Sequence, residues 1–215
     1  RSHQGSWLAQ GAPQDVLPRT PHPWLETRRE RGTREGTSSR RLHPHGRTRG
    51  QRCAQVSYWQ KDSPISAIQS YNTYLPTVMD FPLFNAIGEA FRAAPSWDKG
   101  MIQLYDNLAN DFLYKDINNL LIFAENHDTA RLNHVYPKIE DYKMIITLLA
   151  TARGIPQLYY GSEIGMAGDK SKGDGHIRQD FPGGWEGDVQ NAFTAAGRTA
   201  IQNEYYDFTA KLFNW

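Results

Sequence analysis

The sequence from Ala54 onward predicts an α/β fold in which a strand is followed by a helix three times. Three short runs, 74–80, 120–125 and 155–160, indicate strands, and the second has the apolar run of a strand buried on both faces; apolar residues recur at helical spacing later in each unit. Successive strand–helix units imply a parallel sheet. Three units are fewer than half of the eight in a closed (β/α)8 barrel, so we predict part of a TIM barrel.

The elements before the second strand follow from local signals. A short helical piece is expected over 54–61. Pro82 suits the first turn of a helix, so a helix should follow the first strand directly, with Asp80 or Phe81 near its cap. A second helix is expected to begin near Ser96. Its apolar face, at steps of three and four residues, consists of Met101, Leu104, Leu108 and Phe112.

The second and third strands lead to two further helices. A loop through Pro137 should precede a helix over about 140–152, whose apolar face consists of Tyr142, Ile145, Ile146 and Leu149. After the third strand comes a Gly- and Asp-rich loop over about 161–190. Loops of this length are usually functional or disordered, and the aromatic residues and paired glycines of this one favour order. The last helix presents Ile201, Tyr205, Phe208 and Leu212.

Residues 1–53 differ from the rest of the chain, so we predict them to be a separate segment and 54–215 to be the folded domain. They hold eleven Arg, no Lys and four acidic residues, and they lack Ile, Phe, Tyr, Asn and Met. Such a composition buries too little apolar surface to offset chain entropy, so disorder is expected. Three interpretations compete: a basic arm for a polyanion, an Arg-rich transit peptide, or a segment translated in the wrong reading frame. The missing residue types favour the third.

Bulk properties exclude several classes of partner and site. The formal net charge of +1 gives no bulk attraction to a membrane surface or to nucleic acid, and we expect neither as a partner. The single cysteine, Cys53, excludes an intrachain disulfide framework and a multi-cysteine zinc site. No apolar run reaches the roughly eighteen residues of a membrane span. Periplasmic, extracellular and cytoplasmic locations all stay open.

Polar side chains stand where the three predicted strands end. Asp80 ends the first, Glu125 to Asp128 end and follow the second, and Tyr160 to Glu163 end and follow the third. Because a βα barrel has its active site at the strand ends, and because carboxylates accept strong hydrogen bonds from hydroxyl groups, we predict a site for a polyhydroxyl substrate. The alternative is an ordinary capped turn, with Asp128 and Thr129 as capping residues. A phosphate is less expected, since no glycine-rich loop with a following Lys is present.

At these residues the sequence closely resembles the alpha-amylase family of glycoside hydrolases. Phe123–Asp128 (Phe-Ala-Glu-Asn-His-Asp) resembles the motif at the end of the family's seventh barrel strand, and Gly154–Glu163 resembles its eighth-strand motif. Val78–Leu83 and Asp174–Trp185 are similar to the neopullulanase and cyclomaltodextrinase branch. The resemblance covers about Ala54–Trp215 and implies that this part forms the last three βα units of a TIM barrel.

The resemblance implies a retaining glycosidase that acts on α-1,4 glucans, with α-1,6 bonds as a second option, and substrates such as maltodextrin, cyclomaltodextrin or pullulan. Asp128 matches the family's third carboxylate, the transition-state stabiliser. His127 matches the histidine that bonds sugar hydroxyls, and Asn126 beside it is a further substrate-binding candidate. Arg131 and Arg178 are candidate substrate contacts, with a surface or structural role as the alternative. No metal ligand or cofactor is predicted; calcium would be compatible with the resemblance, but the sequence does not support it.

The sequence also departs from the family at the two groups that perform the chemistry. A retaining enzyme needs a carboxylate nucleophile and a carboxylic acid about 5–5.5 Å apart. In this family both precede the segment that begins at Ala54, but the chain there reads Gly46-Arg-Thr-Arg-Gly-Gln-Arg-Cys53. We therefore expect a fragment of a glycosidase that is inactive as written. The alternatives are a glucan-binding module without catalysis and a protein that binds polyanions through its Arg-rich arm.

Overall fold

The computed structural model describes residues 49–94 and 96–214, and all of them belong to one compact unit of the chain. Side chains are described from Cys53 onward. The expectations of disorder, of a basic arm and of a transit peptide fall almost entirely on residues outside this part. Within the described residues, no helix is both long enough and apolar enough to span a bilayer.

The three predicted strands form one parallel sheet in the order β1-β2-β3, which confirms the predicted α/β arrangement. They are β1 (Val78–Met79), β2 (Leu120–Phe123) and β3 (Ile155–Gln157), and Leu121 pairs with both Met79 and Ile155. The outer strands are shorter than predicted. Before β1, Tyr74 has a φ of 59°, and this left-handed backbone cannot continue a strand. In β2, by contrast, Leu120, Ile122 and Phe123 are fully buried.

Between β1 and β2, the first helix begins where the sequence predicts, and the second helix begins later than predicted. Helix α3 (Phe81–Arg92) is capped by Asp80, whose Oδ1 accepts the Leu83 N–H at 3.0 Å, and Pro82 lies in its first turn. Helix α4 (Ile102–Leu108) begins six residues after Ser96. The predicted start is wrong because residues 96–99 form a turn, in which the Ser96 hydroxyl bonds Asp98.

The predicted apolar face of α4 is correct only in part. Leu104 is buried, but Met101 is 45% exposed and Phe112 is 76% exposed. Both lie outside the helix: Met101 precedes it, and Phe112 belongs to the short 3-10 helix η1 (Asp111–Leu113). A second 3-10 turn, η2 (Ile117–Asn119), leads into β2.

For the helices after β2 and after β3, the observed positions and buried faces agree more closely with the prediction. Helix α6 (Ile139–Thr151) buries Tyr142, Ile145, Ile146 and Leu149, as predicted. Helix α8 (Ala200–Phe213) begins with a capping box between Thr199 and Gln202. The two helices pack through Tyr142 and Tyr205, whose ring centroids are 4.7 Å apart. Ile201 is an exception to the predicted face of α8, with 51% of its surface exposed.

The residues before β1 form two short helices, α1 (Arg49–Ser57) and α2 (Pro64–Ala67). Helix α1 crosses the position at which we placed the domain boundary, and it begins before the predicted piece 54–61. Cys53 lies within it and is 1% exposed in the hydrophobic core.

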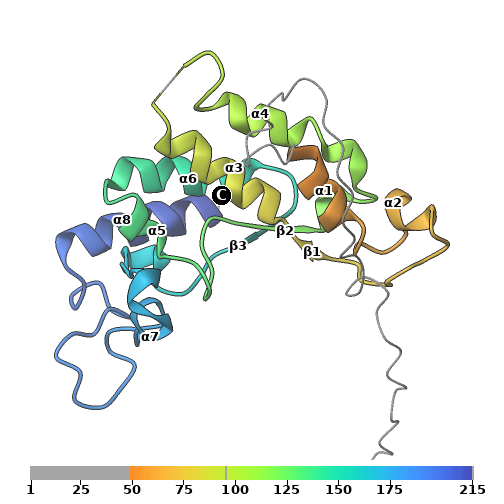
Figure 1. Cartoon of the computed structure of the whole chain (residues 1–215). Helices are drawn as coiled ribbons and strands as arrows, with labels where there is room; N and C mark the ends of the chain where they lie inside the picture. Colours follow the sequence, from red (N-terminus) through yellow and green to blue (C-terminus); the bar gives the residue numbers. More distant parts are fainter. Residues whose placement is uncertain (1–48, 95, 215) are drawn as a thin grey trace, which may run out of the picture. The chain divides into compact units, whose positions relative to one another are not determined.

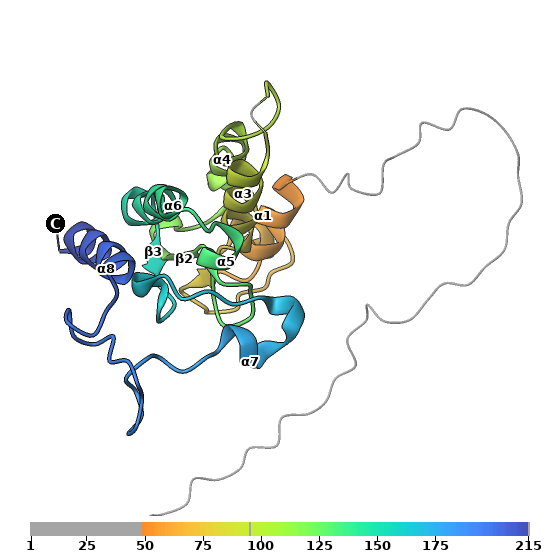
Figure 2. The ribbon, with the colours of Figure 1, turned by 90° about the vertical axis from the view of Figure 1, so that its left-hand side faces the viewer.

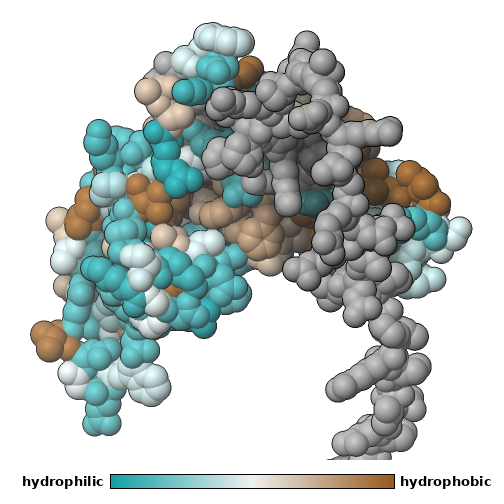
Figure 3. All heavy atoms as spheres, viewed as in Figure 1, coloured by the Kyte–Doolittle hydropathy of each residue, from teal (hydrophilic) through white to brown (hydrophobic). Residues whose placement is uncertain are grey.

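The long loop after β3 is ordered into short helical turns. They are η3 (Ser162–Ile164), η4 (Lys170–Lys172) and α7 (Asp174–Ile177), and a further short helix, α5 (Leu132–Val135), lies within the loop after β2. In both ribbon views α3 and α6 cover one side of the sheet, and α7 lies on the other side (Figures 1 and 2). The face seen in Figure 3 is mainly hydrophilic over α7. The polar end of β2 therefore faces a polar loop layer.

Candidate functional site

The residues after β2 form a tight turn that presents Asp128 outward. Asn126 is 2% exposed, and its side-chain Oδ1 accepts the Asp128 backbone N–H at 2.8 Å. Its own N–H donates to the Thr129 hydroxyl at 2.9 Å. These bonds are the capped turn that the sequence offered as an alternative. The cap, however, uses Asn126 and Thr129, so the carboxylate of Asp128 is left for other contacts.

Asp128, His127 and Arg178, three of the predicted site residues, lie together at the surface. The Asp128 side chain is 61% exposed and is 2.8 Å from Arg178 Nη2 and 3.3 Å from His127 Nε2. Arg178 also donates from Nε to the backbone carbonyl of His127 at 2.8 Å. We call Asp128, His127 and Arg178 the surface triad. Arg178 reaches it from the end of α7, fifty residues along the chain, so α7 fixes the position of the cation.

A second carboxylate shares this cation. Asp174 Oδ2 is 2.9 Å from Arg178 Nη2, and its Oδ1 is bonded by Lys170. The hydrogen bond from Lys170, together with the charge of Arg178, holds the pKa of the Asp174 carboxyl below its usual range. Asp174 is therefore an ionised group at neutral pH and is poorly suited to donate a proton.

Arg131, also predicted as a substrate contact, lies beneath the surface triad and not in it. It is 1% exposed, and its Nη1 is 3.4 Å from Glu125 Oε1. Its guanidinium lies 4.1 Å from the ring centroid of Tyr159 and 4.8 Å from that of Tyr160. Arg131 thus joins the end of β2 to the segment after β3 and supports the turn from below.

Glu125 supports the site from below, a role that was not predicted from the sequence. Its two oxygens accept bonds from the Ser162 hydroxyl, the Leu132 backbone N–H and Arg131. Burial raises the pKa of the Glu125 carboxyl, although these donors oppose the shift. Strand alternation gave no signal for this burial, because consecutive residues from Ile122 to Asn126 are all buried.

The expectation that the ends of all three strands contribute side chains to one exposed site is wrong for Asp80. It is fully buried, and its Oδ2 is 2.6 Å from Arg153 Nη1 while its Oδ1 caps α3. Arg153 binds Asp111 through two further nitrogens. Asp80 belongs to a buried ionic cluster in the core and cannot meet a substrate at the surface.

Aromatic surface lies next to the triad. Tyr160 is 40% exposed, and its hydroxyl donates to the carbonyl of Gln179, the residue after Arg178, at 2.7 Å. Within residues 49–94 and 96–214, no group of three or more His, Cys, Asp or Glu side chains is arranged to hold a metal ion. The described chemistry at this site is therefore a fixed carboxylate, an imidazole, a guanidinium and an exposed phenol ring.

Comparison with known proteins decides the family. A family model described as the alpha amylase catalytic domain matches residues 58–207. The chain belongs to the alpha-amylase family. The matched residues include β1, β2, β3 and the surface triad, so the parallel sheet described above is part of this family's catalytic domain.

Individual members of the alpha-amylase family match shorter stretches. A beta/alpha-amylase of Paenibacillus polymyxa is 31% identical over 109 residues, which are 47% of this chain and 9% of that protein. Alpha-amylase 3 of Dictyoglomus thermophilum is 31% identical over 134 residues, which are 59% of this chain and 24% of that protein. The crystal structure of a Geobacillus thermoleovorans alpha-amylase complexed with acarbose aligns with 69% of this chain and 31% of that one, at 24% identity and a TM-score of 0.47. The chain thus spans less than a quarter of these two curated relatives.

Proposed function

We propose that the surface triad is the sugar-binding part of a retaining α-glucan glycosidase, with Asp128 as the transition-state stabiliser. The observation that carries the proposal is the Asp128 carboxylate, which is exposed but held in place by Arg178 and His127. A fixed, charged acceptor binds hydroxyl groups strongly because the bond is charge-assisted and little freedom is lost on binding. Membership of the alpha-amylase family supports an α-linked glucose polymer as the ligand.

Other features fit the same ligand. Tyr160 offers an aromatic face beside the triad, and a sugar ring can place its C–H surface against such a face. His127 is 58% exposed at its side chain and can bond a further hydroxyl. Asn126 is buried and its Oδ1 is occupied by the Asp128 N–H, so we assign it the support of the turn and assign direct sugar contact to His127 and Asp128.

We further propose that this chain binds the glucan but does not hydrolyse it. Hydrolysis with retention needs a nucleophile and a proton donor on opposite sides of the scissile bond. Asp174, which shares Arg178 with Asp128, is held ionised, and Glu125 is buried with both oxygens occupied. Neither can serve as the proton donor for a sugar at the triad. We place the three strands as the last three of the eight in the barrel, and the nucleophile and proton donor would then lie on earlier strands.

The motifs Val78–Leu83 and Asp174–Trp185 support the neopullulanase and cyclomaltodextrinase branch as the finer assignment. On this proposal the ligands are α-1,4-linked maltooligosaccharides, with pullulan as a ligand that also contains α-1,6 bonds. The segment Asp174–Trp185 begins with α7, which supplies Arg178 to the triad. The branch motif would therefore act by positioning that cation.

The experiment measures binding of maltoheptaose by isothermal titration calorimetry to the wild-type chain and to two charge-matched variants. Asp128→Asn should weaken binding about tenfold, the usual effect of losing hydrogen bonds to a charged group. Asp207→Asn makes the same change on the exposed surface of α8 and should leave binding unchanged. Equal affinity of the wild type and Asp128→Asn would contradict the binding proposal, and release of reducing sugar by the purified chain would contradict the proposal that it is inactive.

A further inference from the structure

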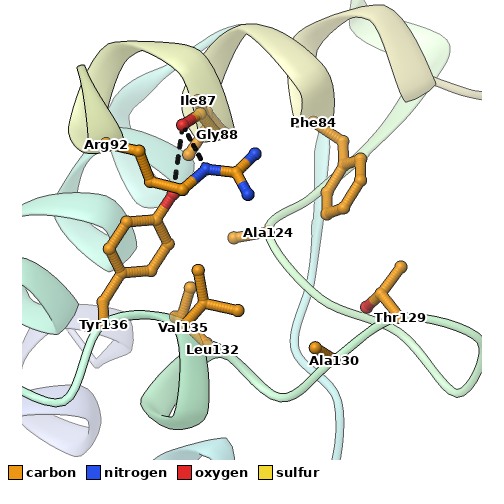
Figure 4. Close-up of a pocket in the computed structure, with 10 residues that line it drawn as sticks. All are labelled: Phe84, Ile87, Gly88, Arg92, Ala124, Thr129, Ala130, Leu132, Val135 and Tyr136. Atoms are coloured by element: carbon orange, nitrogen blue, oxygen red, sulfur yellow. Dashed lines mark hydrogen bonds between the residues drawn. The ribbon is translucent and has the colours of Figure 1, made fainter. Parts of the chain in front are cut away.

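A small pocket lies between α3, the end of β2 and α5, and its lining includes Thr129 and Ala130, which follow Asp128, but none of the residues of the surface triad. Its volume is about 130 Å³, and its lining includes Phe84 and Ile87 from α3, Ala124 after β2, and Leu132 from α5 (Figure 4). Ile87, Ala124 and Leu132 are buried residues of the core. The walls of the pocket are therefore mainly apolar, and the family assignment gives this pocket no ligand.

One cation stands at this pocket. Arg92 is an exposed residue in the last turn of α3, and its Nε donates to the Gly88 carbonyl at 2.8 Å. Figure 4 shows its guanidinium extending over Ala124 toward Phe84. Its Nη1 and Nη2 have no hydrogen-bond or ion-pair partner among the described residues. Within residues 49–94 and 96–214, two donors of Arg92 are thus left without a partner at the mouth of an apolar pocket.

Gly88 allows this placement of the cation. A Cβ at residue 88 would lie 2.6 Å from Arg92 Nη2, so any larger residue would push the guanidinium aside. The Gly88 carbonyl also accepts the Tyr136 hydroxyl at 3.4 Å, which ties the opposite wall of the pocket to the same turn of α3. A glycine within a helix is destabilising relative to alanine, and here it permits a charged group to lie against the helix backbone.

We propose that this pocket binds a small carboxylate with a compact apolar body, of the size and shape of benzoate. An apolar cavity of about 150 Å³ accommodates benzene, so the volume suits one six-membered ring. A guanidinium with two free donors matches a carboxylate, which it can bind through two parallel hydrogen bonds. The carboxylate would stay at the partly hydrated mouth while the ring enters the apolar interior, and both parts of the ligand would be satisfied.

The chemistry of the walls selects against other small ligands. A glucose unit would place hydroxyl groups against Ile87, Ala124 and Leu132 without partners, and buried unpaired hydroxyls are costly. An uncharged ring would fill the same volume but would lack the charge-assisted, bidentate hydrogen bonds that a carboxylate makes with Arg92. The site is thus distinct from the surface triad in both position and ligand, and it does not depend on the proposed glucan binding.

The test is a titration of the full chain with sodium benzoate, followed by saturation-transfer NMR, with benzyl alcohol as the uncharged probe of similar size. Benzoate should bind in the millimolar range or tighter, and more tightly than benzyl alcohol. Arg92→Met keeps most of the side-chain volume and should weaken benzoate binding about tenfold while weakening benzyl alcohol binding much less. Lys99→Met, which removes a nearby charge that does not line this pocket, should change neither.

Gly88→Ala provides a variant in which the charge is kept. It should raise helix stability or leave it unchanged, so loss of benzoate binding in this variant cannot be attributed to unfolding. We expect weaker benzoate binding because the added Cβ displaces the guanidinium. Failure of the wild type to bind benzoate, equal binding by Arg92→Met, or equal affinity of the wild type for benzoate and benzyl alcohol would each overturn the proposal.

Discussion

Replacing Arg131 with Met should destabilise the folded chain strongly, because the substitution leaves Glu125 buried without its cation. The two groups are 1% and 4% exposed at their side chains, and they are joined at 3.4 Å. Met resembles the stem of Arg in length and flexibility, so the change removes the charge with little loss of packing. The result tests whether Arg131 supports the site from below.

The expected magnitude follows from the environment of the pair. Removing one partner of a buried ion pair costs about 3–5 kcal/mol. Loss of the contacts between the guanidinium and the rings of Tyr159 and Tyr160 adds about 0.5–1 kcal/mol for each at partly exposed sites. Domains of this size are stable by about 5–15 kcal/mol, so Arg131→Met should lower the free energy of unfolding by a large fraction of its total value.

The assay is urea denaturation followed by far-ultraviolet circular dichroism, for the wild type, Arg131→Met, Glu125→Gln and the double variant. Neutralising Glu125 removes the uncompensated charge, so the double-mutant cycle should give an interaction energy of about 2–3 kcal/mol. A cost below about 1 kcal/mol for Arg131→Met, or additive effects of the two substitutions, would refute the reasoning.

The pH dependence provides an independent check on Glu125. Because burial raises its pKa above the usual 4.5, the folded state binds more protons than the unfolded state between the two values. Stability from this group is therefore complete below about pH 4.5 and is lost as the pH rises through the raised pKa. Removing the cation raises the pKa further, so the deficit of Arg131→Met should be small near pH 4 and should grow toward pH 8.

Three further predictions concern the core and the helix ends. Asp80→Asn should cost about 1.5–3 kcal/mol in thermal or urea unfolding, since it removes one charged hydrogen bond from Arg153, which keeps its two bonds to Asp111; a cost near zero would show that the cluster is not a stabilising contact. Thr199→Ala should cost about 1 kcal/mol by removing the α8 capping box, whereas Thr199→Ser should cost much less. Cys53 should react with a thiol reagent only after unfolding, because it is 1% exposed and burial raises the pKa of its thiol; rapid labelling of the native chain would contradict the described position of α1.

The sequence predicts the elements whose signals are local and repeated. Helix α6 has four apolar residues at steps of one, three and four, and all four are buried as expected. The cap of α3 was also predictable, since Asp80 and Pro82 lie within one turn of each other. The start of α4 was not, because the turn at Ser96 depends on a side-chain bond to Asp98 that competes with helix formation.

Buried charges explain most of what the sequence could not indicate. Asp80, Glu125 and Arg131 are charged residues in or beside strands and loops, and the usual expectation for such residues is exposure. Arg153, the partner of Asp80, lies seventy-three residues away, and no spacing rule connects them. The candidate site shows the same limit: Asp128 and Arg178 could each be singled out, but their contact depends on the fold of the loop that contains α7.

The most direct test of the central claim is to map maltoheptaose binding on the wild-type chain by two-dimensional NMR, with cellohexaose as a β-linked control. The account predicts that signals of His127, Asp128, Tyr160 and Arg178 shift with maltoheptaose and not with cellohexaose. Signals from the α3–α5 pocket, such as those of Ile87 and Val135, should not move. Shifts confined to other surfaces, or equal shifts with both sugars, would contradict the assignment of the surface triad as an α-glucan site.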